Sequence, residues 1–244
     1  MKIKVINPNT TLSMTRSIEH AARRFVGLDT QVWAVSPQLG PASIESFYDE
    51  YLSIPGVLEE IRRGDEEQCD AYVIACFGDP GLQAARELTA HPVVGIAEAA
   101  CFVASTLAKR FSVVTVLHRS RAFIEETVVG YVPREKVVSV RTTGWPVLAF
   151  ERDPEAGLAA IAEESRHAVN RDHAEAILLG CAGFVDFADE LAEELQVPVL
   201  DGVAAATKYA ELLVTMGQRT SKVGTYASPE RKQFTGLLAP FGTA

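Results

Sequence analysis

The chain has 244 residues, of which 48% are hydrophobic and 23% charged, as expected of a globular protein that buries a sizeable core in one large or two modest domains. Its 32 acidic residues outnumber the 23 basic ones and give a net charge of −9, so we expect no nucleic-acid partner. Four scattered cysteines are too few for a disulfide framework, which favours reduced thiols in a cytoplasm.

The first apolar run, at residues 3–6, predicts a buried strand. Polar turn residues follow it too soon for a signal peptide or a membrane span, so we expect no membrane partner. From there, short β-branched runs alternate with amphipathic segments, a pattern typical of a parallel sheet with helices on both faces. The predicted strands are residues 3–6, 31–35, 71–75, 93–96, 112–116, 137–140, 176–179, 199–201 and 222–225. The predicted helices are residues 12–26, 57–63, 81–89, 97–109, 119–129, 155–171, 186–195 and 203–216.

The loops after the first two predicted strands place polar side chains at the carboxyl ends of those strands. Asn7 and Asn9 occur in the first loop, where local rules explain them as an Asx turn or a helix cap. In the second loop Ser46 and Asp49 match a capping box, and Ser43 precedes it. Ligands of open α/β sheets bind at the carboxyl ends of strands, so Asn7, Asn9 and Ser43 are also candidates for binding a polar, planar substrate.

One sequence pattern occurs twice: an apolar strand, a cysteine, a turn, a helix and a second strand that opens with proline. The first copy contains Cys76 and Pro92, which are 16 residues apart, and the second contains Cys181 and Pro198, which are 17 apart. Such a duplication predicts two related half-molecules whose matching strand ends face each other across a cleft.

We therefore predict an α/β fold with two similar Rossmann-like lobes. Each lobe would contain a mainly parallel sheet, a pseudo-twofold axis would relate the two, and the active site would lie in the cleft between them. The repeated units lie in the middle and at the three-quarter point of the chain. From these positions we predict a first lobe of residues 1–97 plus 205–244, with a second lobe of residues 98–204 inserted into it.

Both cysteines of the repeat directly follow an apolar strand. A lone cysteine in that position is more often a small buried core residue than a catalyst. The correspondence between Cys76 and Cys181 favours a functional pair, and a helix start beside each thiol is expected to lower its pKa from about 8.5. Cys69, before a strand, and Cys101, inside a helix, lack this setting and are interpreted as structural.

Other residues at the strand ends have a structural and a functional interpretation. Asp79 either caps the helix that follows it or contacts substrate. Thr115 and His118 lie near the end of another strand, where each either borders the cleft or has only a local role. Gly78 and Gly183 let the backbone approach a ligand, so that N–H groups beside the thiols could bind a developing oxyanion. Neither a metal-ligand spacing nor a nucleotide-binding loop is present, and we expect no metal or other cofactor.

Five short motifs occur at these strand ends: Asn-Pro-Asn-Thr at 7–10, Ser-Ile-Glu-Ser at 43–46, Ala-Cys-Phe-Gly-Asp-Pro-Gly-Leu at 75–82, Gly-Cys-Ala-Gly at 180–183 and Pro-Val-Leu-Asp-Gly at 198–202. Together they resemble the hydantoin racemase branch of the aspartate/glutamate racemase superfamily, from Ile3 to about Tyr226. The chain departs from the pattern of that branch at His118, Trp145 and Phe184.

The resemblance implies a cofactor-independent isomerase that interconverts the D and L enantiomers of 5-monosubstituted hydantoins. It implies that Cys76 and Cys181 are the two acid/base residues, in a chain that forms a homo-oligomer and takes a small-molecule substrate with a hydantoin-type ring. The substrate contacts that the resemblance implies are Asn9, Ser43, Gly78, Thr115 and Gly183. Further candidates for substrate binding are Asn7, Ile44, Phe77, Asp79, His118 and Ala182.

Other functions remain open from the sequence. Allantoin is itself a substituted hydantoin, and allantoin racemase has very similar motifs. A maleate-type isomerase of the same superfamily also uses two cysteines, whereas a decarboxylase of that kind needs only one. A non-catalytic small-molecule binding module is the alternative from a different class, and the thiol in each copy of the repeat argues against it.

Overall fold

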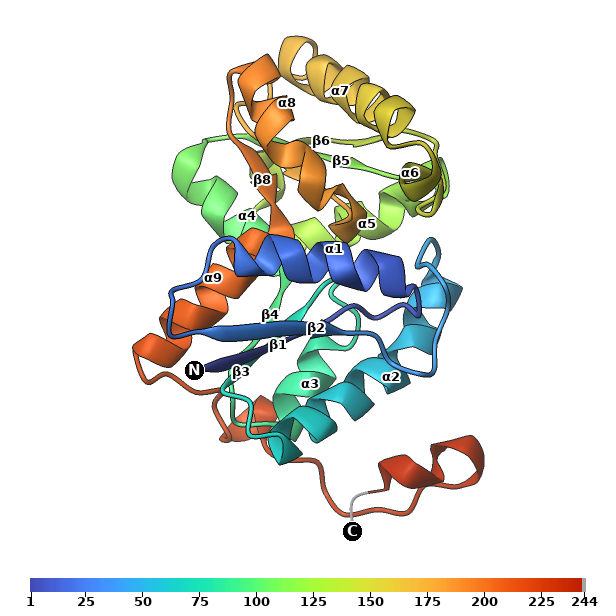
Figure 1. Cartoon of the computed structure of the whole chain (residues 1–244), viewed down its shortest axis with the longest axis vertical. Helices are drawn as coiled ribbons and strands as arrows, with labels where there is room; N and C mark the ends of the chain where they lie inside the picture. Colours follow the sequence, from blue (N-terminus) through green and yellow to red (C-terminus); the bar gives the residue numbers. More distant parts are fainter. Residues whose placement is uncertain (243–244) are drawn as a thin grey trace.

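Two four-stranded parallel sheets, one in each lobe, form the centre of the computed structural model, which describes residues 1–242 (Figure 1). The first sheet has the order β2-β1-β3-β4 and contains β1 (Lys2–Ile6), β2 (Gln31–Val35), β3 (Ala71–Ile74) and β4 (Val93–Gly95). The second has the order β6-β5-β7-β8 and contains β5 (Phe111–Thr115), β6 (Val137–Thr142), β7 (Ile177–Leu179) and β8 (Val199–Asp201). Since the two orders are equivalent, the predicted fold of two similar α/β lobes is confirmed.

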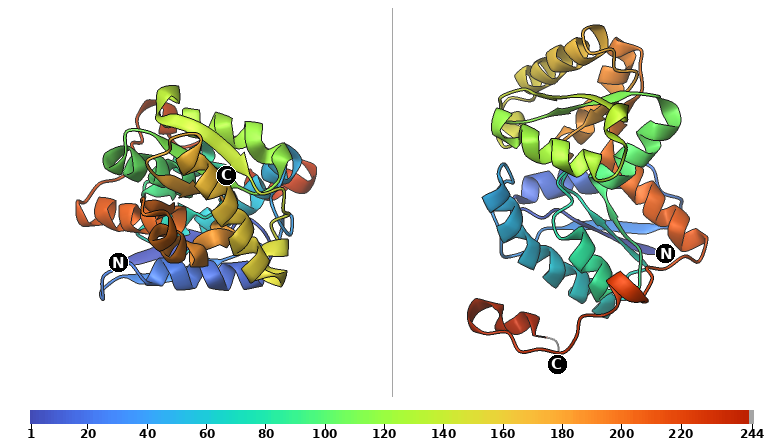
Figure 2. Two further views of the ribbon diagram at one scale, coloured as in Figure 1. Left: turned by 90° about the horizontal axis from the view of Figure 1, so that it is seen from above. Right: turned by 180° about the vertical axis from the view of Figure 1, so that it is seen from behind.

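Helices cover both faces of the sheets and also join the two lobes (Figures 1 and 2). They are α1 (Leu12–Arg23), α2 (Phe47–Glu66), α3 (Leu82–Leu88), α4 (Ile96–Leu107), α5 (Arg121–Val129), α6 (Ala149–Arg152), α7 (Pro154–Asn170), α8 (Ala188–Leu195) and α9 (Gly202–Thr215). Helix α4 leaves the first sheet and contacts β7 and β8, whereas α9 leaves the second sheet and contacts β1, β3 and β4. The two helices also pack against each other, so each lobe contributes a helix to its neighbour.

The strands are short apolar runs because both of their faces are covered. Every residue of β3 and of β5 is buried, which is the pattern of parallel strands between two layers of helices. One continuous apolar cluster extends from Ile3 in the first sheet through α4 to Ile177 in the second. The lobes therefore share a core, and the carboxyl ends of their strands are held against each other.

The predicted strand at residues 222–225 is wrong. Val223 is 86% exposed, and Gly224–Tyr226 form a short 3-10 helix outside either sheet. The Lys222 ammonium instead donates hydrogen bonds to the carbonyl oxygens of Arg86 and Glu87, at 2.9 and 2.7 Å, near the end of α3. A cation at the carboxyl end of a helix satisfies carbonyl groups that have no partner within the helix. A contact with a helix more than a hundred residues away, and not strand pairing, therefore holds this segment.

Helix α2 is longer than the sequence predicts. It begins at Phe47, ten residues before the predicted start at Val57, and Pro55 lies inside it. The capping box is present as expected, because the Ser46 hydroxyl accepts a hydrogen bond from the Asp49 amide. Proline in a helix interior removes one backbone hydrogen bond, and burial of Gly56 and Val57 offsets this loss. Helix α6 is a further short element that was not predicted.

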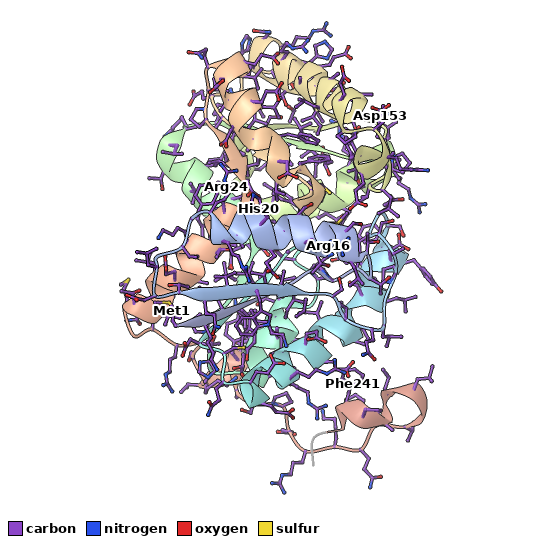
Figure 3. The ribbon with its side chains drawn as sticks, viewed as in Figure 1. Met1, Arg16, His20, Arg24, Asp153 and Phe241 are labelled. Atoms are coloured by element: carbon purple, nitrogen blue, oxygen red, sulfur yellow. The ribbon has the colours of Figure 1, made fainter. Side chains whose placement is uncertain are left out.

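The last described segment lies outside the two layers of helices. After α9, residues 228–242 run beside α2 and α3 and line a groove with them; Phe241 of this segment is labelled in Figure 3 (Figures 2 and 3). Arg62 of α2 donates a hydrogen bond of 2.7 Å to the carbonyl oxygen of Pro240 in this segment. Within residues 1–242, no helix has both the length and the apolar composition needed to cross a membrane.

Candidate active site

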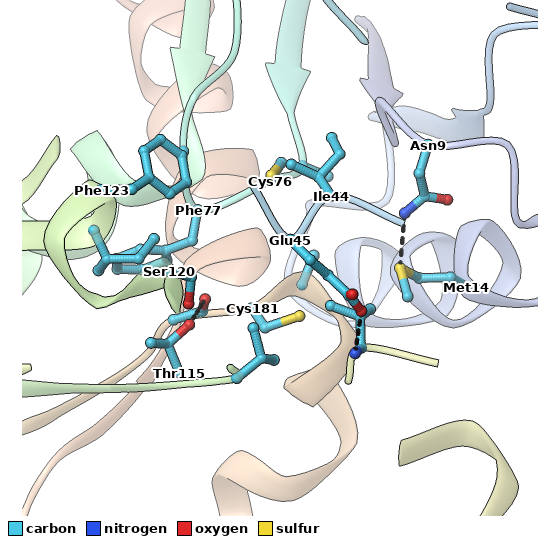
Figure 4. A pocket seen from close by; sticks show the side chains of 17 residues that line it. Asn9, Met14, Ile44, Glu45, Cys76, Phe77, Thr115, Ser120, Phe123 and Cys181 are labelled. Atoms are coloured by element: carbon cyan, nitrogen blue, oxygen red, sulfur yellow. Dashed lines mark hydrogen bonds between the residues drawn. The ribbon is translucent and has the colours of Figure 1, made fainter. Parts of the chain in front are cut away.

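The two cysteines of the repeat line one pocket between the lobes (Figure 4). Cys76 follows β3 and Cys181 follows β7, and these strands occupy the same position in their respective sheets. The two residues are more than a hundred positions apart in the chain, and they reach one cavity because the lobes pack with the carboxyl ends of these strands towards each other. Its volume is about 40 Å³, and much of its wall is made of apolar side chains, including those of Met14, Phe123 and Val147.

Both thiols are partly exposed in this pocket, unlike those of Cys69 and Cys101, which are 1% and 0% exposed. Burial raises the pKa of Cys181 to about 11, opposed by a hydrogen bond of 3.4 Å from the Gly183 amide to the sulfur. Burial raises the pKa of Cys76 even further, opposed by the Gly78 amide. The expected lowering of both pKa values is wrong, because loss of hydration outweighs the adjacent N–H groups.

Only one of the two thiols directly precedes a helix start. A 3-10 helix, Ala182–Phe187, begins beside Cys181, whereas α3 begins at Leu82, six residues after Cys76. A turn fills the interval after Cys76, closed by a hydrogen bond of 2.9 Å from the Asp79 amide to the Cys76 carbonyl oxygen. The amide groups near Cys76 therefore belong to a tight turn.

Asp79 does not cap the helix that follows it. The residue before α3 is Gly81, and the Asp79 carboxylate instead accepts hydrogen bonds from the Ala97 and Glu98 amides of α4, at 3.1 and 2.9 Å. The Tyr131 hydroxyl, from the other lobe, donates a third hydrogen bond of 2.8 Å. A side chain at Gly95 would collide with this carboxylate, since its Cβ would lie 2.2 Å from Asp79 Cγ. Asp79 thus connects the turn after Cys76 to α4 and to the second lobe.

Two buried carboxyl groups, those of Asp79 and Glu50, raise the pKa of the Cys76 thiol. Burial raises the pKa of Asp79 to about 7, partly opposed by its hydrogen bonds. Burial, with a smaller effect from the negative charge of Asp79, also raises the pKa of Glu50 in α2 to about 7. When ionised, both carboxylates disfavour a thiolate at Cys76. Cys76 is therefore the more difficult of the two thiols to ionise.

About half of the predicted substrate contacts lie in the wall of the pocket. The residues in this group are Asn9, Ile44, Phe77, Gly78, Thr115 and Ala182. The predicted contacts outside the wall are Asn7, Ser43, Asp79, His118 and Gly183. The Asn7 amide group donates to Asn9 Oδ1 at 3.0 Å and so holds Asn9 in place. His118 Nδ1 is 2.6 Å from Thr142 Oγ1. All eleven remain predictions as substrate contacts.

Several residues of the wall had no signal in the sequence. Met14 lies in α1, Phe123 in α5 and Val147 before α6, and each reaches the pocket only because the lobes pack together. Glu45 also lines the pocket, and its Oε1 accepts a hydrogen bond of 2.7 Å from the Val147 amide of the other lobe. Glu45 belongs to the motif at 43–46 and follows the predicted contact Ile44. This position in the motif was the one feature of the sequence that could have indicated Glu45 as a residue of the wall.

Three positions where the chain departs from the expected pattern lie outside the pocket wall. Phe184 is 0% exposed and packs edge to face on Phe150, with ring centroids 4.7 Å apart. Trp145 also packs on Phe150, with ring centroids 5.5 Å apart. His118 is hydrogen-bonded to Thr142, as described above. The unusual aromatic residues therefore fill the second lobe and do not narrow the pocket.

Comparisons with known proteins give a consistent result. The profile of a family described as Asp/Glu/Hydantoin racemase matches residues 3–210. The chain is 60% identical to a hydantoin racemase of Pseudomonas sp. (strain NS671) over 242 residues, which cover 99% of this chain and 97% of that protein. An allantoin racemase from Klebsiella pneumoniae has a similar structure, with a TM-score of 0.96 and 43% identity over 99% of each chain. An allantoin racemase from Pseudomonas fluorescens gives a TM-score of 0.92 and 37% identity, over 97% of this chain and 100% of that one.

Proposed function

The chain belongs to the Asp/Glu/hydantoin racemase family, and we propose that it interconverts the D and L enantiomers of 5-monosubstituted hydantoins with Cys76 and Cys181 as its two acid/base residues and without a cofactor. The observation that carries this proposal is the meeting of the two thiols in one small pocket, each from the end of the equivalent strand of its lobe. An inversion at one carbon requires a base on one face and an acid on the other, which two opposed thiols supply.

In the proposed reaction, one cysteine as thiolate removes the hydrogen from C5 of the hydantoin. The electron pair moves into the adjacent C4 carbonyl and gives a planar enolate. The other cysteine, as a neutral thiol, then donates its proton to the opposite face of C5. After each turnover the first cysteine is a thiol and the second is a thiolate, so no proton is gained or lost overall. In the reverse reaction the second cysteine is the base and the first is the acid.

The rest of the pocket supports the charge that develops on the substrate. Backbone N–H groups beside Gly78 and Gly183 are positioned near the sulfurs, and such fixed donors stabilise an oxyanion without having to reorganise. The apolar walls keep bulk water away from the enolate, which favours protonation by the second thiol. General acid/base catalysis typically contributes about 100- to 10,000-fold, so these fixed donors would account for a further part of the acceleration.

The charge of the pocket favours a hydantoin over a dianion such as maleate. Among the described residues that line the cavity there is no lysine, arginine or histidine to pair with a carboxylate. Burying an unpaired anion in such a site is costly. A maleate-type isomerase and a substrate like aspartate or glutamate are therefore less compatible with this pocket than a neutral ring.

Allantoin is the second candidate substrate, because it contains the same ring and because allantoin racemases are similar to this chain in structure. Identity to the Pseudomonas hydantoin racemase is higher, at 60% against 43% for the Klebsiella allantoin racemase. We therefore place hydantoins with an apolar C5 substituent first, which agrees with the apolar walls. A non-catalytic binding module would leave the paired thiols without a purpose.

Polarimetry tests this proposal directly. Optically pure benzylhydantoin and isopropylhydantoin are expected to lose their rotation faster than allantoin, and maleate is expected to give no fumarate. The control is the uncatalysed loss of rotation at the same pH. A chain that leaves the rotation of every hydantoin unchanged while binding one of them would contradict the racemase proposal and support a binding module.

The rate is expected to rise with pH. Since burial raises the pKa of Cys181 to about 11 and that of Cys76 further, nearly all free enzyme at neutral pH carries two neutral thiols. The fraction with one thiolate then increases about tenfold for each pH unit below these pKa values, and kcat/KM should follow it from about pH 6 to 8.5. Initial rates corrected for the uncatalysed reaction measure this profile. A plateau across that range would mean that one thiol is already ionised in the free enzyme.

Three further properties are part of the proposal. We place the boundaries of the lobes near residues 97 and 205, in agreement with the contacts that α4 and α9 make across them. We propose a homo-oligomer, for which an apolar groove along the exposed side of α9 is available. The reduced state of the four cysteines supports a cytoplasmic location.

A further inference from the structure

We propose that Glu45 selects the substrate of the pocket: its carboxylate accepts a ring N–H of the hydantoin and excludes substrates whose C5 substituent is negatively charged. This inference rests on the proposed function and adds to it the class of substituent that the site rejects. Apart from the two thiols, Glu45 is the single ionisable side chain among the described residues that line the cavity. An apolar cavity with one fixed negative charge distinguishes strongly between neutral and anionic ligands.

Glu45 is held at this position from both lobes. Its amide donates a hydrogen bond of 3.1 Å to Asp49 Oδ2, which fixes the loop before α2. Its Oε1 accepts a hydrogen bond of 2.7 Å from the Val147 amide, 102 residues further along the chain (Figure 4). A carboxylate anchored in this way is a rigid part of the wall, and its second oxygen has a defined direction.

That second oxygen, Oε2, has no hydrogen-bond partner within residues 1–242. Figure 4 shows the Glu45 carboxylate in the same part of the pocket as Cys181, and the negative charge of Glu45 contributes to the raised pKa of that thiol. In a hydantoin, the N1–H group is bonded directly to C5, the carbon that exchanges its proton. A ring with C5 beside the Cys181 sulfur therefore has its N1–H group in the part of the pocket that also holds the Glu45 carboxylate, and in the proposed pose Oε2 accepts this group.

The other polar side chains of the wall already have partners. Thr115 Oγ1 donates to the Gly180 carbonyl oxygen at 2.9 Å, and Ser120 Oγ donates to the Leu117 carbonyl oxygen at 2.7 Å. Asn9 Oδ1 accepts hydrogen bonds from the Asn7 side chain and the Thr11 amide, and Asn9 Nδ2 is directed at the Met14 sulfur at 3.1 Å. The two hydroxyl oxygens can still accept a hydrogen bond, but among the described residues of the wall Glu45 has the one carboxylate oxygen without a partner, and a charged acceptor binds an N–H group more strongly.

Two substrates of equal shape and different charge test the inference. The hydantoin derived from glutamate carries a carboxyethyl group at C5, and the one derived from glutamine carries the isosteric carbamoylethyl group. We expect the wild-type kcat/KM for the carboxylate compound to be lower by at least about tenfold, because like charges in a desolvated site repel. Glu45→Gln keeps the acceptor for Val147 and removes the charge, and should bring the two kcat/KM values within about threefold of each other.

Glu151→Gln is the matched control. Glu151 is an exposed carboxylate that accepts a hydrogen bond of 2.8 Å from Ser13 of the other lobe, and it lies outside the pocket wall. This variant also removes one negative charge and keeps an acceptor for the donor on the other lobe, but it does so outside the pocket wall, so it should keep the wild-type ratio. A ratio in Glu45→Gln equal to that of the wild type would overturn the inference, and so would equal kcat/KM values in the wild type.

Binding separates this inference from the racemase proposal. The thermal shift of the wild type with each of the two compounds is expected to be larger for the carbamoylethyl compound, and the difference should disappear in Glu45→Gln. Should the wild type racemise neither these two compounds nor benzylhydantoin, the proposed function fails, while this measurement still decides whether Glu45 selects by charge. Equal thermal shifts in the wild type would count against Glu45 as the selecting residue.

Discussion

Replacing either Cys76 or Cys181 by serine is expected to lower the rate of racemisation by about a thousandfold or more, since each thiol supplies a proton-transfer step that a serine hydroxyl performs poorly. Each variant should nevertheless keep one half-reaction. In heavy water, Cys181→Ser still has Cys76, whose thiolate can remove the C5 hydrogen from one enantiomer, exchange it for deuterium from the solvent and return deuterium to the same face. Cys76→Ser should do the same with the other enantiomer. Proton NMR of each pure enantiomer measures this exchange.

The pattern of exchange is more informative than the loss of rate. Cys69→Ser is the matched control, because Cys69 is buried, also has a pKa raised to about 11 by burial, and lies outside the pocket. It should retain racemisation. Exchange of the same enantiomer by both pocket variants would contradict two bases on opposite faces, and unchanged racemisation in either variant would end the two-cysteine mechanism.

Replacing Asp79 by alanine is expected to lower the free energy of unfolding by about 3 kcal/mol or more, because three buried donors would lose their acceptor. The loss should be larger at pH 5 than at pH 8. Burial raises the pKa of Asp79 from 3.8 to about 7 in the folded state, so its contribution to stability is present at low pH and falls as the pH rises towards 7. Urea unfolding at the two pH values measures both effects.

Asp153→Ala is the control for Asp79→Ala. Asp153 caps α7 at the surface through a hydrogen bond of 3.1 Å from the Ala156 amide, and losing a cap of this kind typically costs about 1 kcal/mol. Equal losses in the two variants would mean that Asp79 is an ordinary cap and does not join the lobes. Racemisation in Asp79→Ala should also decline, since the turn after Cys76 depends on Asp79.

The sequence predicts the eight strands and their division into two sheets because parallel strands buried on both faces are recognisable as short apolar runs. It also predicts the meeting of Cys76 and Cys181, since a duplicated unit places equivalent residues at equivalent strand ends. Contacts between distant segments were not predictable in the same way. The predicted helix began at residue 57, whereas α2 begins at Phe47 and continues through Pro55. The 222–225 run resembled a strand, although Lys222 is bound to α3.

The same limit applies to the site. Thr115 ends β5 and Gly78 lies in the turn after β3, so both were found by that rule, whereas Phe123 and Val147 reach the pocket through packing of one lobe on the other. The ionisation of the thiols was predicted with the wrong sign, because helix starts are visible in a sequence but the loss of water around a side chain is not. Asp79 illustrates both effects: its neighbours in the chain suggested a local cap, and the α4 amides that it actually binds are 18 and 19 residues away.

The cavity between the sulfurs has a volume of about 40 Å³, enough for a few water molecules and far below the roughly 300–1,000 Å³ of common ligand sites. A five-membered ring with a side chain is larger than this space, so the two lobes must move apart to admit it. Reactant and product are mirror images of equal size, so the pocket must open twice in every catalytic cycle, once for substrate binding and once for product release. The rate of this opening would then limit the turnover number of the enzyme. Raising the solvent viscosity with sucrose should slow racemisation equally in the D-to-L and the L-to-D direction.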